Sequence, residues 1–352
     1  NGDSYTDFIA SKVTDNLIIM NNTSYGYGHT ITRDIYLFTC QGDGTFVKTI
    51  CSLDKELSSS DGRCDGYRIF SQGDYNGDGL SDFILAYIDC TGRIYNDSKE
   101  ALIYYSNGDG TFSKYPYYFG MGNMIHTHGD FNGDGKTDFI IAGTDDLGRS
   151  SFSTSCKVFF GTSDKGVFQI VPYNPGSRPE SKIVSSQDFN GDGLTDFIIA
   201  KISEYGDITN ISTETYKYIS KGNGTFQKTL CPLTPPNKPS YWENNLRITY
   251  QGDFDGDGLG DIMLAWGTGW GQYCICGPED NDYGTNYMFF SRNEGNFDYL
   301  SNFSTIIGDY PISARFQVYT TGDFNGDGKI DSWLIPIDIE GRPFFDIPLS
   351  SI

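Results

Sequence analysis

Short apolar segments alternate with glycine-rich polar stretches along most of the chain. Four of the clearest apolar segments start at an Asp: DFILAYI (82–88), DFIIAG (138–143), DFIIAKI (196–202) and DIMLAWG (261–267). They are short and rich in Ile and aromatic side chains, which is typical of buried strands. Since no stretch has a sustained helical periodicity, the pattern predicts an all-β fold.

These strands belong to a unit that repeats about every 60 residues. One strand enters a polar stretch (YRIFSQ, 67–72), a second leaves it, a third follows (ALIYYS, 101–106), and a Gly-rich turn leads to a fourth (GDGTFSKY, 108–115). A long repeat of four strands predicts a single β-propeller domain over residues 1–352. It would have about six four-stranded blades, beginning near residues 1, 67, 123, 182, 246 and 315.

The two ends of the chain each hold an incomplete unit. The first unit lacks its entering strand, and the last shows only two or three strands. We therefore expect the chain to be part of a longer protein, with a seventh blade outside this stretch as an alternative.

The polar stretch carries the candidate chemistry. It occurs as GDYNGDGLSDF (73–83), GDFNGDGKTDF (129–139), QDFNGDGLTDF (187–197), GDFDGDGLGDI (252–262) and GDFNGDGKIDS (322–332), with a shortened copy at residues 1–8. Counted from the first Asp, oxygen-bearing side chains fall at positions 1, 3, 5 and 9, and position 6 is Gly in every full copy. Alternating oxygen ligands around a glycine follow the logic of the EF-hand loop.

The flanking strands and the closing acid at position 9 distinguish these loops from EF-hands. We interpret them as calcium loops in β-hairpins. Oxygen ligands in a flexible loop favour Ca²⁺ over Mg²⁺, and no copy contains the His or Cys expected for zinc or copper. The metal is expected to be structural, because the protein supplies every ligand position. Asx-Gly turns without metal are the alternative.

Charge changes the range of expected partners. The formal net charge is −21, and the repeated stretches hold 18 of the 46 acidic residues. A chain this acidic is not expected to bind nucleic acid. There is no long apolar segment, so membrane insertion is not expected either.

Cysteine and histidine add little catalytic chemistry. The even number of cysteines, eight, favours disulfides in a secreted or cell-surface protein, with reduced buried cysteines as the alternative. His126 and His128 alternate on one predicted strand and are expected to share a face. No nucleophile motif accompanies these histidines, so we do not expect an enzyme. A hydrolase is the least favoured of the functional hypotheses.

The loops and strands together resemble the FG-GAP/VCBS repeat family, whose best-known member is the N-terminal propeller of integrin α subunits. The integrin-type Gly-Ala-Pro sequence is absent, so the chain looks closer to microbial members found in lectins, adhesins and toxin-complex proteins. The resemblance implies one Ca²⁺ per loop, five or six per chain, held between the first two strands of a blade.

The resemblance also implies which residues are ligands, with the position-7 residue acting through its carbonyl. They are Asp74, Asn76, Asp78, Leu80 and Asp82; Asp130, Asn132, Asp134, Lys136 and Asp138; Asp188, Asn190, Asp192, Leu194 and Asp196; Asp253, Asp255, Asp257, Leu259 and Asp261; Asp323, Asn325, Asp327, Lys329 and Asp331. The shortened copy would contribute Asn1, Asp3 and Asp7, but it lacks position 1 and has Ser4 in place of the glycine.

Two segments interrupt the repeat and are candidates for ligand binding, residues 232–245 and 266–286. Exposed aromatic side chains suit sugar stacking or a protein contact. The aromatics concerned are Trp242, Trp266, Trp270, Tyr273 and Tyr283. The sequence thus predicts an extracellular module that binds a glycan or a protein. The alternative is a structural or gating propeller in a larger toxin or adhesin, where its partners would include other domains of the parent protein.

Overall fold

The computed structural model describes most of the predicted strands and four of the full loops. The described residues are 8–18, 28–40, 45–50, 66–89, 92–94, 101–144, 150–151, 156–176, 180–203, 207–234, 244–268, 272–273, 287–292, 296–301, 315–322 and 331–337. They fall into two compact units, residues 1–130 with 134–174 and residues 131–133 with 175–352. Each unit is described by itself.

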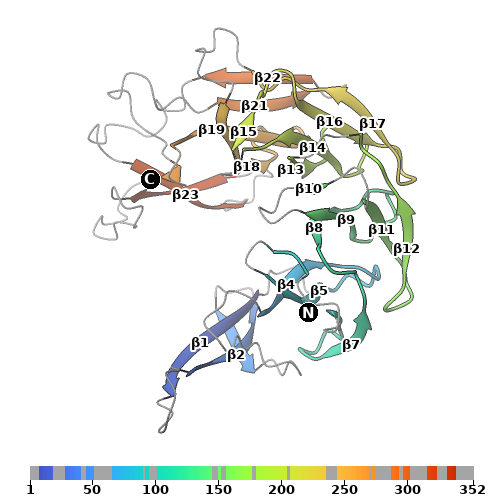
Figure 1. The fold of residues 1–352 in the computed structure, drawn as a ribbon, viewed down its shortest axis with the longest axis vertical. Coiled ribbons are helices and arrows are strands. Elements are labelled where there is room, and N and C mark those ends of the chain that lie inside the picture. Colours follow the sequence, from blue (N-terminus) through green and yellow to red (C-terminus); the bar gives the residue numbers. More distant parts are fainter. Residues whose placement is uncertain are drawn as a thin grey trace. The chain divides into compact units, whose positions relative to one another are not determined.

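The first unit contains three antiparallel sheets (Figure 1). The first joins β1 (Phe8–Ile18), β2 (Gly28–Cys40) and β3 (Phe46–Ile50). The second is four-stranded, in the order β4 (Gly66–Gly73), β5 (Asp82–Ile88), β6 (Ala101–Ser106) and β7 (Phe112–Tyr117). The third pairs β8 (Asn123–Gly129), β9 (Asp138–Thr144), β11 (Lys157–Gly161) and β12 (Phe168–Pro172), and the short β10 (Ser150–Ser151) also pairs with β9.

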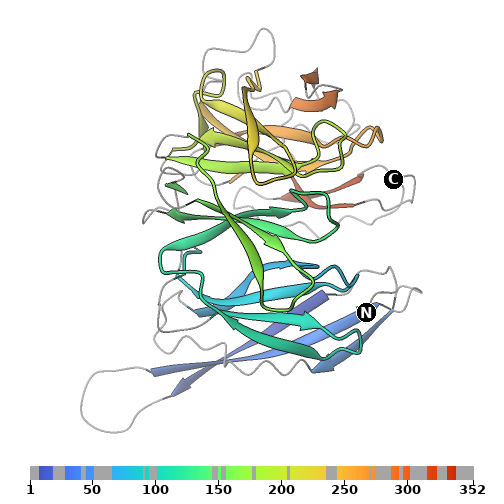
Figure 2. The same ribbon diagram turned by 90° about the vertical axis from the view of Figure 1, so that its right-hand side faces the viewer.

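The second unit repeats the arrangement (Figure 2). One four-stranded sheet is β13 (Ser181–Gln187), β14 (Asp196–Lys201), β16 (Thr215–Ser220) and β17 (Phe226–Leu230). The next is β18 (Asn244–Gly252), β19 (Asp261–Thr268), β21 (Tyr287–Arg292) and β22 (Asn296–Ser301), extended by the short β15 (Ile208–Thr209) and β20 (Gln272–Tyr273). A final hairpin pairs β23 (Arg315–Gly322) with β24 (Asp331–Ile337).

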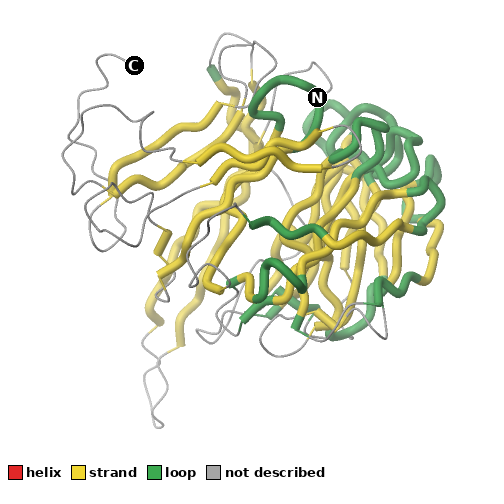
Figure 3. The backbone as a smooth tube through the Cα atoms, turned by 90° about the horizontal axis from the view of Figure 1, so that it is seen from above, coloured by secondary structure: helices red, strands yellow, loops and turns green. Residues whose placement is uncertain are grey.

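The prediction of an all-β fold built from four-stranded antiparallel sheets is confirmed. Strands and loops account for all the described residues (Figure 3), and none of them forms a helix that could cross a membrane. The strands that leave the loops start at the predicted residues Asp82, Asp138, Asp196 and Asp261.

A bulge recurs where each entering strand pairs with the strand that leaves the loop. The register shifts between Ile69 and Ser71, and likewise between Ile125 and Thr127, with equivalent shifts in β13, β18 and β23. A bulge adds one residue to one strand and breaks the alternation of faces. The prediction that His126 and His128 share a face assumed unbroken alternation, and this premise is wrong because the bulge falls at His126.

Paired aromatic side chains build the sheet cores. The Phe that follows the closing Asp stacks on an aromatic of the third strand, since the two lie opposite each other in the register. The ring centroids are 4.8 Å apart for Phe83–Tyr104, and 5.0 Å apart for both Phe139–Phe159 and Phe197–Tyr218. Cross-strand aromatic pairs of this kind stabilise a sheet beyond their buried area.

Candidate metal centres

Each described loop connects the entering strand of a sheet to the strand that leaves it. The structure describes the loops at 74–82, 130–138, 188–196 and 253–261. The predicted ligands Asn1, Asp3, Asp7, Asp323, Asn325, Asp327 and Lys329 lie outside the described residues, and Asp331 is described only as the first residue of β24.

The carboxylate at position 1 organises the turn by accepting hydrogen bonds from the loop backbone. Asp188 Oδ1 accepts from Gly191 N at 2.7 Å and Asp188 Oδ2 accepts from Gly193 N at 2.8 Å. Asp74 and Asp253 accept the same two bonds, and Asp130 accepts from Asp134 N and Gly135 N. Such bonds hold the loop curled before any ion arrives, as expected for Asx-type turns.

Positions 3, 5 and 7 continue the curl. Asp192 Oδ1 accepts from Leu194 N at 2.9 Å, and Asn190 Nδ2 donates to Asp192 Oδ2 at 3.0 Å. The same contacts link Asn76, Asp78 and Leu80. In the loop at 130–138, Lys136 adds an ion pair through its Nζ to Asp134 Oδ2 at 3.1 Å, which partly offsets the charge of that loop.

The closing carboxylate at position 9 is buried and ties three strands together. Asp196 Oδ2 accepts from Phe189 N at 3.1 Å, and Asp196 Oδ1 accepts from Ser220 N of the third strand at 2.8 Å. Asp82 and Asp261 make the equivalent pairs of bonds, and Asp138 accepts from Gly161 N. All four closing carboxylates are at most 1% exposed.

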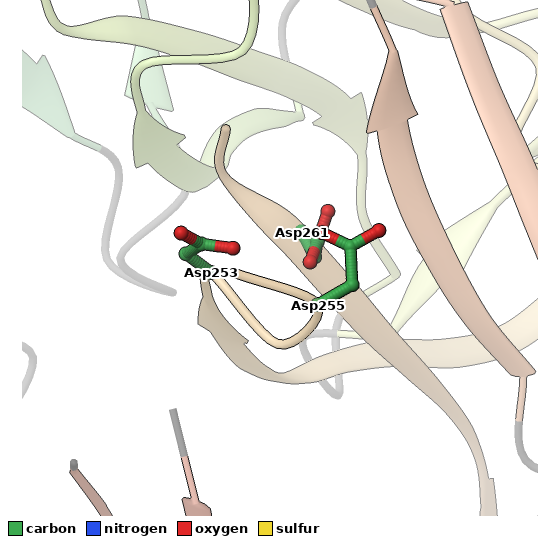
Figure 4. Close-up of side chains that lie close together, drawn as sticks. All are labelled: Asp253, Asp255 and Asp261. Atoms are coloured by element: carbon green, nitrogen blue, oxygen red, sulfur yellow. The ribbon is translucent and has the colours of Figure 1, made fainter. Parts of the chain in front are cut away.

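The carboxylates converge on a common point in the loop at 253–261. Asp253, Asp255 and Asp261 each place an oxygen within 4.8 Å of the oxygens of the other two (Figure 4). Asp253 and Asp255 reach in from the loop, and Asp261 reaches in from the first residue of β19. Oxygen donors gathered on a flexible loop fit a hard cation such as Ca²⁺.

Consecutive loops are also joined by backbone hydrogen bonds, which the sequence did not predict. In the first unit Thr137 N donates to Asp74 O at 2.6 Å, and in the second unit Gly260 N donates to Asp188 O at 2.7 Å. Gly191 has a φ of 79°, and a Cβ there would lie 2.9 Å from Leu259 Cδ2. The positive φ therefore favours glycine at position 4, and a side chain there would also displace the leucine of the next loop.

Burial raises the pKa of three closing carboxyls, those of Asp82, Asp196 and Asp261, well above the ordinary value of 3.8. The pKa is about 7 for Asp82 and Asp196 and about 6 for Asp261, with the neighbouring loop carboxylates adding repulsion. Burial and repulsion both disfavour the charged form. A bound cation would favour the charged form and offset both effects, so the charge distribution fits the metal that the loop geometry suggests.

A pH dependence follows for the calcium-free protein. The folded state holds these protons more tightly than the unfolded state, so their stabilising effect is full below about pH 4 and is lost as the pH rises to about 7. In excess chelator we expect the melting temperature to be roughly 5–10 °C lower at pH 7.5 than at pH 5. With excess calcium the loss should disappear. A calcium-free melting temperature that rises over this range would contradict the assignment.

The ligand-binding candidates are only partly placed. Trp242, Trp270 and Tyr283 lie outside the described residues. Trp266 lies on β19 and Tyr273 on β20, and these two strands pair through Gly267 and Tyr273. The backbone thus brings two of the five predicted aromatics together at the C-terminal end of β19.

The disulfide prediction is wrong for two of the cysteines. Cys156 and Cys231 are buried free thiols. Burial raises the pKa of Cys156 to about 12 and that of Cys231 to about 11, so both stay protonated and unreactive. Cys40 is described only through its backbone, and the other cysteines lie outside the described residues.

The fold and the loops define an all-β repeat protein in which four repeats have a described acidic hairpin loop. A family model described as FG-GAP-like repeat matches residues 74–141 and 188–264, which together contain all four described loops. The chain therefore carries FG-GAP-like repeats, and the resemblance to the FG-GAP/VCBS family predicted from the sequence is confirmed. No curated protein matches the chain.

Proposed function

We propose that the chain is a calcium-stabilised β-propeller of about six blades that acts as an extracellular binding module. The observation that carries the proposal is the common geometry of the four described loops. In each loop the position-1 carboxylate curls the backbone, and the closing carboxylate is buried at the start of the next strand. Five or six Ca²⁺ ions per chain would be held by the side chains at positions 1, 3, 5 and 9 and by the position-7 carbonyl.

The ion would supply a structural crosslink. It would neutralise carboxylates that repel one another and join the loop to the strand that starts at the closing Asp. Sheets connected by long loops gain rigidity from such links, which allows the remaining loops to present a binding surface.

A polar cavity in the second unit is a candidate ligand site. Its volume is about 510 Å³, within the range typical of small-ligand pockets. Lys201, Asn210, Glu214, Tyr216 and Lys228 are among its lining residues. Because β14 runs from Asp196 to Lys201, the cavity lies at the end of this sheet opposite the loop at 188–196.

The charges of the cavity suit a saccharide with an acidic group. Lys201 pairs with Glu214 at 3.4 Å, and Lys228 Nζ lies 4.2 Å from the centroid of the Tyr216 ring. Two lysines and one glutamate give the lining a net positive charge in an otherwise acidic chain. The amide, hydroxyl and aromatic groups beside them are those that hold sugars. The aromatics of residues 266–286 offer a second candidate surface.

A glycan array with the calcium-loaded protein tests the binding role. We expect selective binding of acidic glycans, and a loss of at least about tenfold in affinity for Tyr216→Ala if the cavity is the site, because the aromatic face is removed. Tyr118→Ala, at a tyrosine that is 62% exposed, is the matched control. Loss of binding on Trp270→Ala instead would place the site in the inserted segment. No glycan binding by the folded, calcium-loaded protein would contradict the glycan ligand.

A further inference from the structure

The loop at 253–261 differs from the other described loops at position 3. The other three have Asn there. In two of them the Asn amide donates to the position-5 carboxylate, from Asn76 Nδ2 to Asp78 Oδ2 at 2.9 Å and from Asn190 Nδ2 to Asp192 Oδ2 at 3.0 Å. Asp255 has no amide hydrogen to donate at the equivalent position. Without another donor, the carboxylates of Asp255 and Asp257 would repel each other.

Arg292 supplies the missing donor. Its Nη1 donates to Asp255 Oδ2 at 2.8 Å and to Asp257 Oδ2 at 3.1 Å. Its Nε donates to Asp298 Oδ2 at 2.9 Å, which fixes the guanidinium from the side away from the loop. One arginine thus replaces the amide of the Asn loops and adds a positive charge.

The position of Arg292 in its sheet has equivalents in the other repeats. It follows Ser291, whose N–H binds the closing Asp261. The residues that follow the corresponding third-strand positions are Asn107, Thr162 and Lys221. Lys221 Nζ donates to Gln227 Oε1 at 2.7 Å. The arginine therefore occurs in the described repeat that has an Asp at position 3.

Counting charges shows what this pairing does. The loop at 253–261 has four aspartates, and Arg292 reduces their summed charge from −4 to −3. The other partner of Arg292, Asp298, lies outside the loop, and its side chain is 72% exposed, so solvent screens its charge. The loops at 74–82 and 188–196 have three aspartates each and the same net charge of −3. The substitution of Asp for Asn at position 3 is thus electrically compensated from the neighbouring strand.

We propose that Arg292 is an internal counter-charge that lowers the calcium affinity of the loop at 253–261 and holds that loop together when calcium is absent. The inference rests on the proposed calcium sites. Calcium affinity in loops of this kind depends on ligand charge count and rigidity. Removing a positive charge close to a divalent ion strengthens binding of the ion, and this outweighs two partly exposed hydrogen bonds.

Hydrogen exchange measured by mass spectrometry resolves the loops individually. The full chain is titrated with Ca²⁺, and the midpoint of protection is followed for peptides covering 253–261 and 188–196. In Arg292→Gln we expect the midpoint for 253–261 to fall about tenfold, and its calcium-free exchange to become faster. The peptide covering 188–196 should not change.

Two further variants separate charge compensation from local damage. Asp255→Asn combined with Arg292→Gln recreates the Asn pattern and should return the 253–261 midpoint toward the wild-type value. Lys221→Gln changes the equivalent residue of the preceding sheet and should leave the 188–196 midpoint unchanged. A 253–261 midpoint that stays fixed or rises in Arg292→Gln, while the other loops still respond to calcium, would overturn the role of Arg292 alone. No calcium response in any loop would overturn the proposed calcium sites and the role of Arg292 with them.

Discussion

Chelating calcium is expected to lower the melting temperature of this protein by about 20 °C. Each occupied loop contributes about 2.7 kcal/mol when free calcium is a hundred times the dissociation constant. The four described loops together would then contribute about 11 kcal/mol, and about 2 °C per kcal/mol is typical of a large domain.

The measurement is calorimetric melting in excess calcium and in excess EGTA at pH 7.5. Magnesium added back to the EGTA sample is the control, because its preference for a rigid octahedron and retained water should prevent it from restoring the melting temperature. Equal melting temperatures with and without chelator would mean that the loops are turns held by hydrogen bonds alone.

Replacing a closing carboxylate should have the largest effect of any single substitution considered. Asp196→Ala removes the acceptor of two buried backbone N–H groups, from Phe189 and Ser220. It also removes a proposed calcium ligand. In excess calcium we expect a loss of about 5 kcal/mol, which combines unsatisfied donors with the lost ion.

The dependence of this loss on calcium separates the two contributions. In chelator the wild-type carboxyl is itself penalised by burial, so the loss on Asp196→Ala should shrink to about 2 kcal/mol. Asp196→Asn keeps one acceptor oxygen but not the second. In excess calcium its loss of stability should therefore be smaller than that of Asp196→Ala. Asp164→Ala, on an exposed hairpin, should change stability by less than about 0.5 kcal/mol. A loss that is the same in calcium and in chelator would show that Asp196 acts only as a hydrogen-bond acceptor.

The positions of the strands around each loop could be predicted from short stretches of sequence. The strands that leave the loops start at the predicted aspartates, because an Asp at position 9 both closes the loop and opens an apolar run. The third strand was also predicted, as at residues 101–106, where β6 is found. The strand β12 (Phe168–Pro172) has a weaker local signal, because its hairpin has TSDKG in place of the GDGTF-type turn of other repeats.

Contacts between different repeats could not be predicted from the sequence, because they join residues that are far apart along the chain. The bond from Gly260 to Asp188 joins residues 72 positions apart, and Leu259 occupies the space that a side chain at Gly191 would need. The pairing of Arg292 with Asp255 also spans two strands, although the change from Asn to Asp at position 3 was a visible signal. The bulge at His126 is also unmarked by residue type, although a bulge recurs in the other entering strands.

The central claim is that these loops bind calcium, and the direct test is the metal content of the purified chain. The protein would be equilibrated with low micromolar calcium and magnesium together, separated from free ions, and measured by plasma emission spectrometry. The account predicts five or six calcium ions per chain and almost no magnesium. Fewer than one calcium per chain, or magnesium in its place, would contradict it.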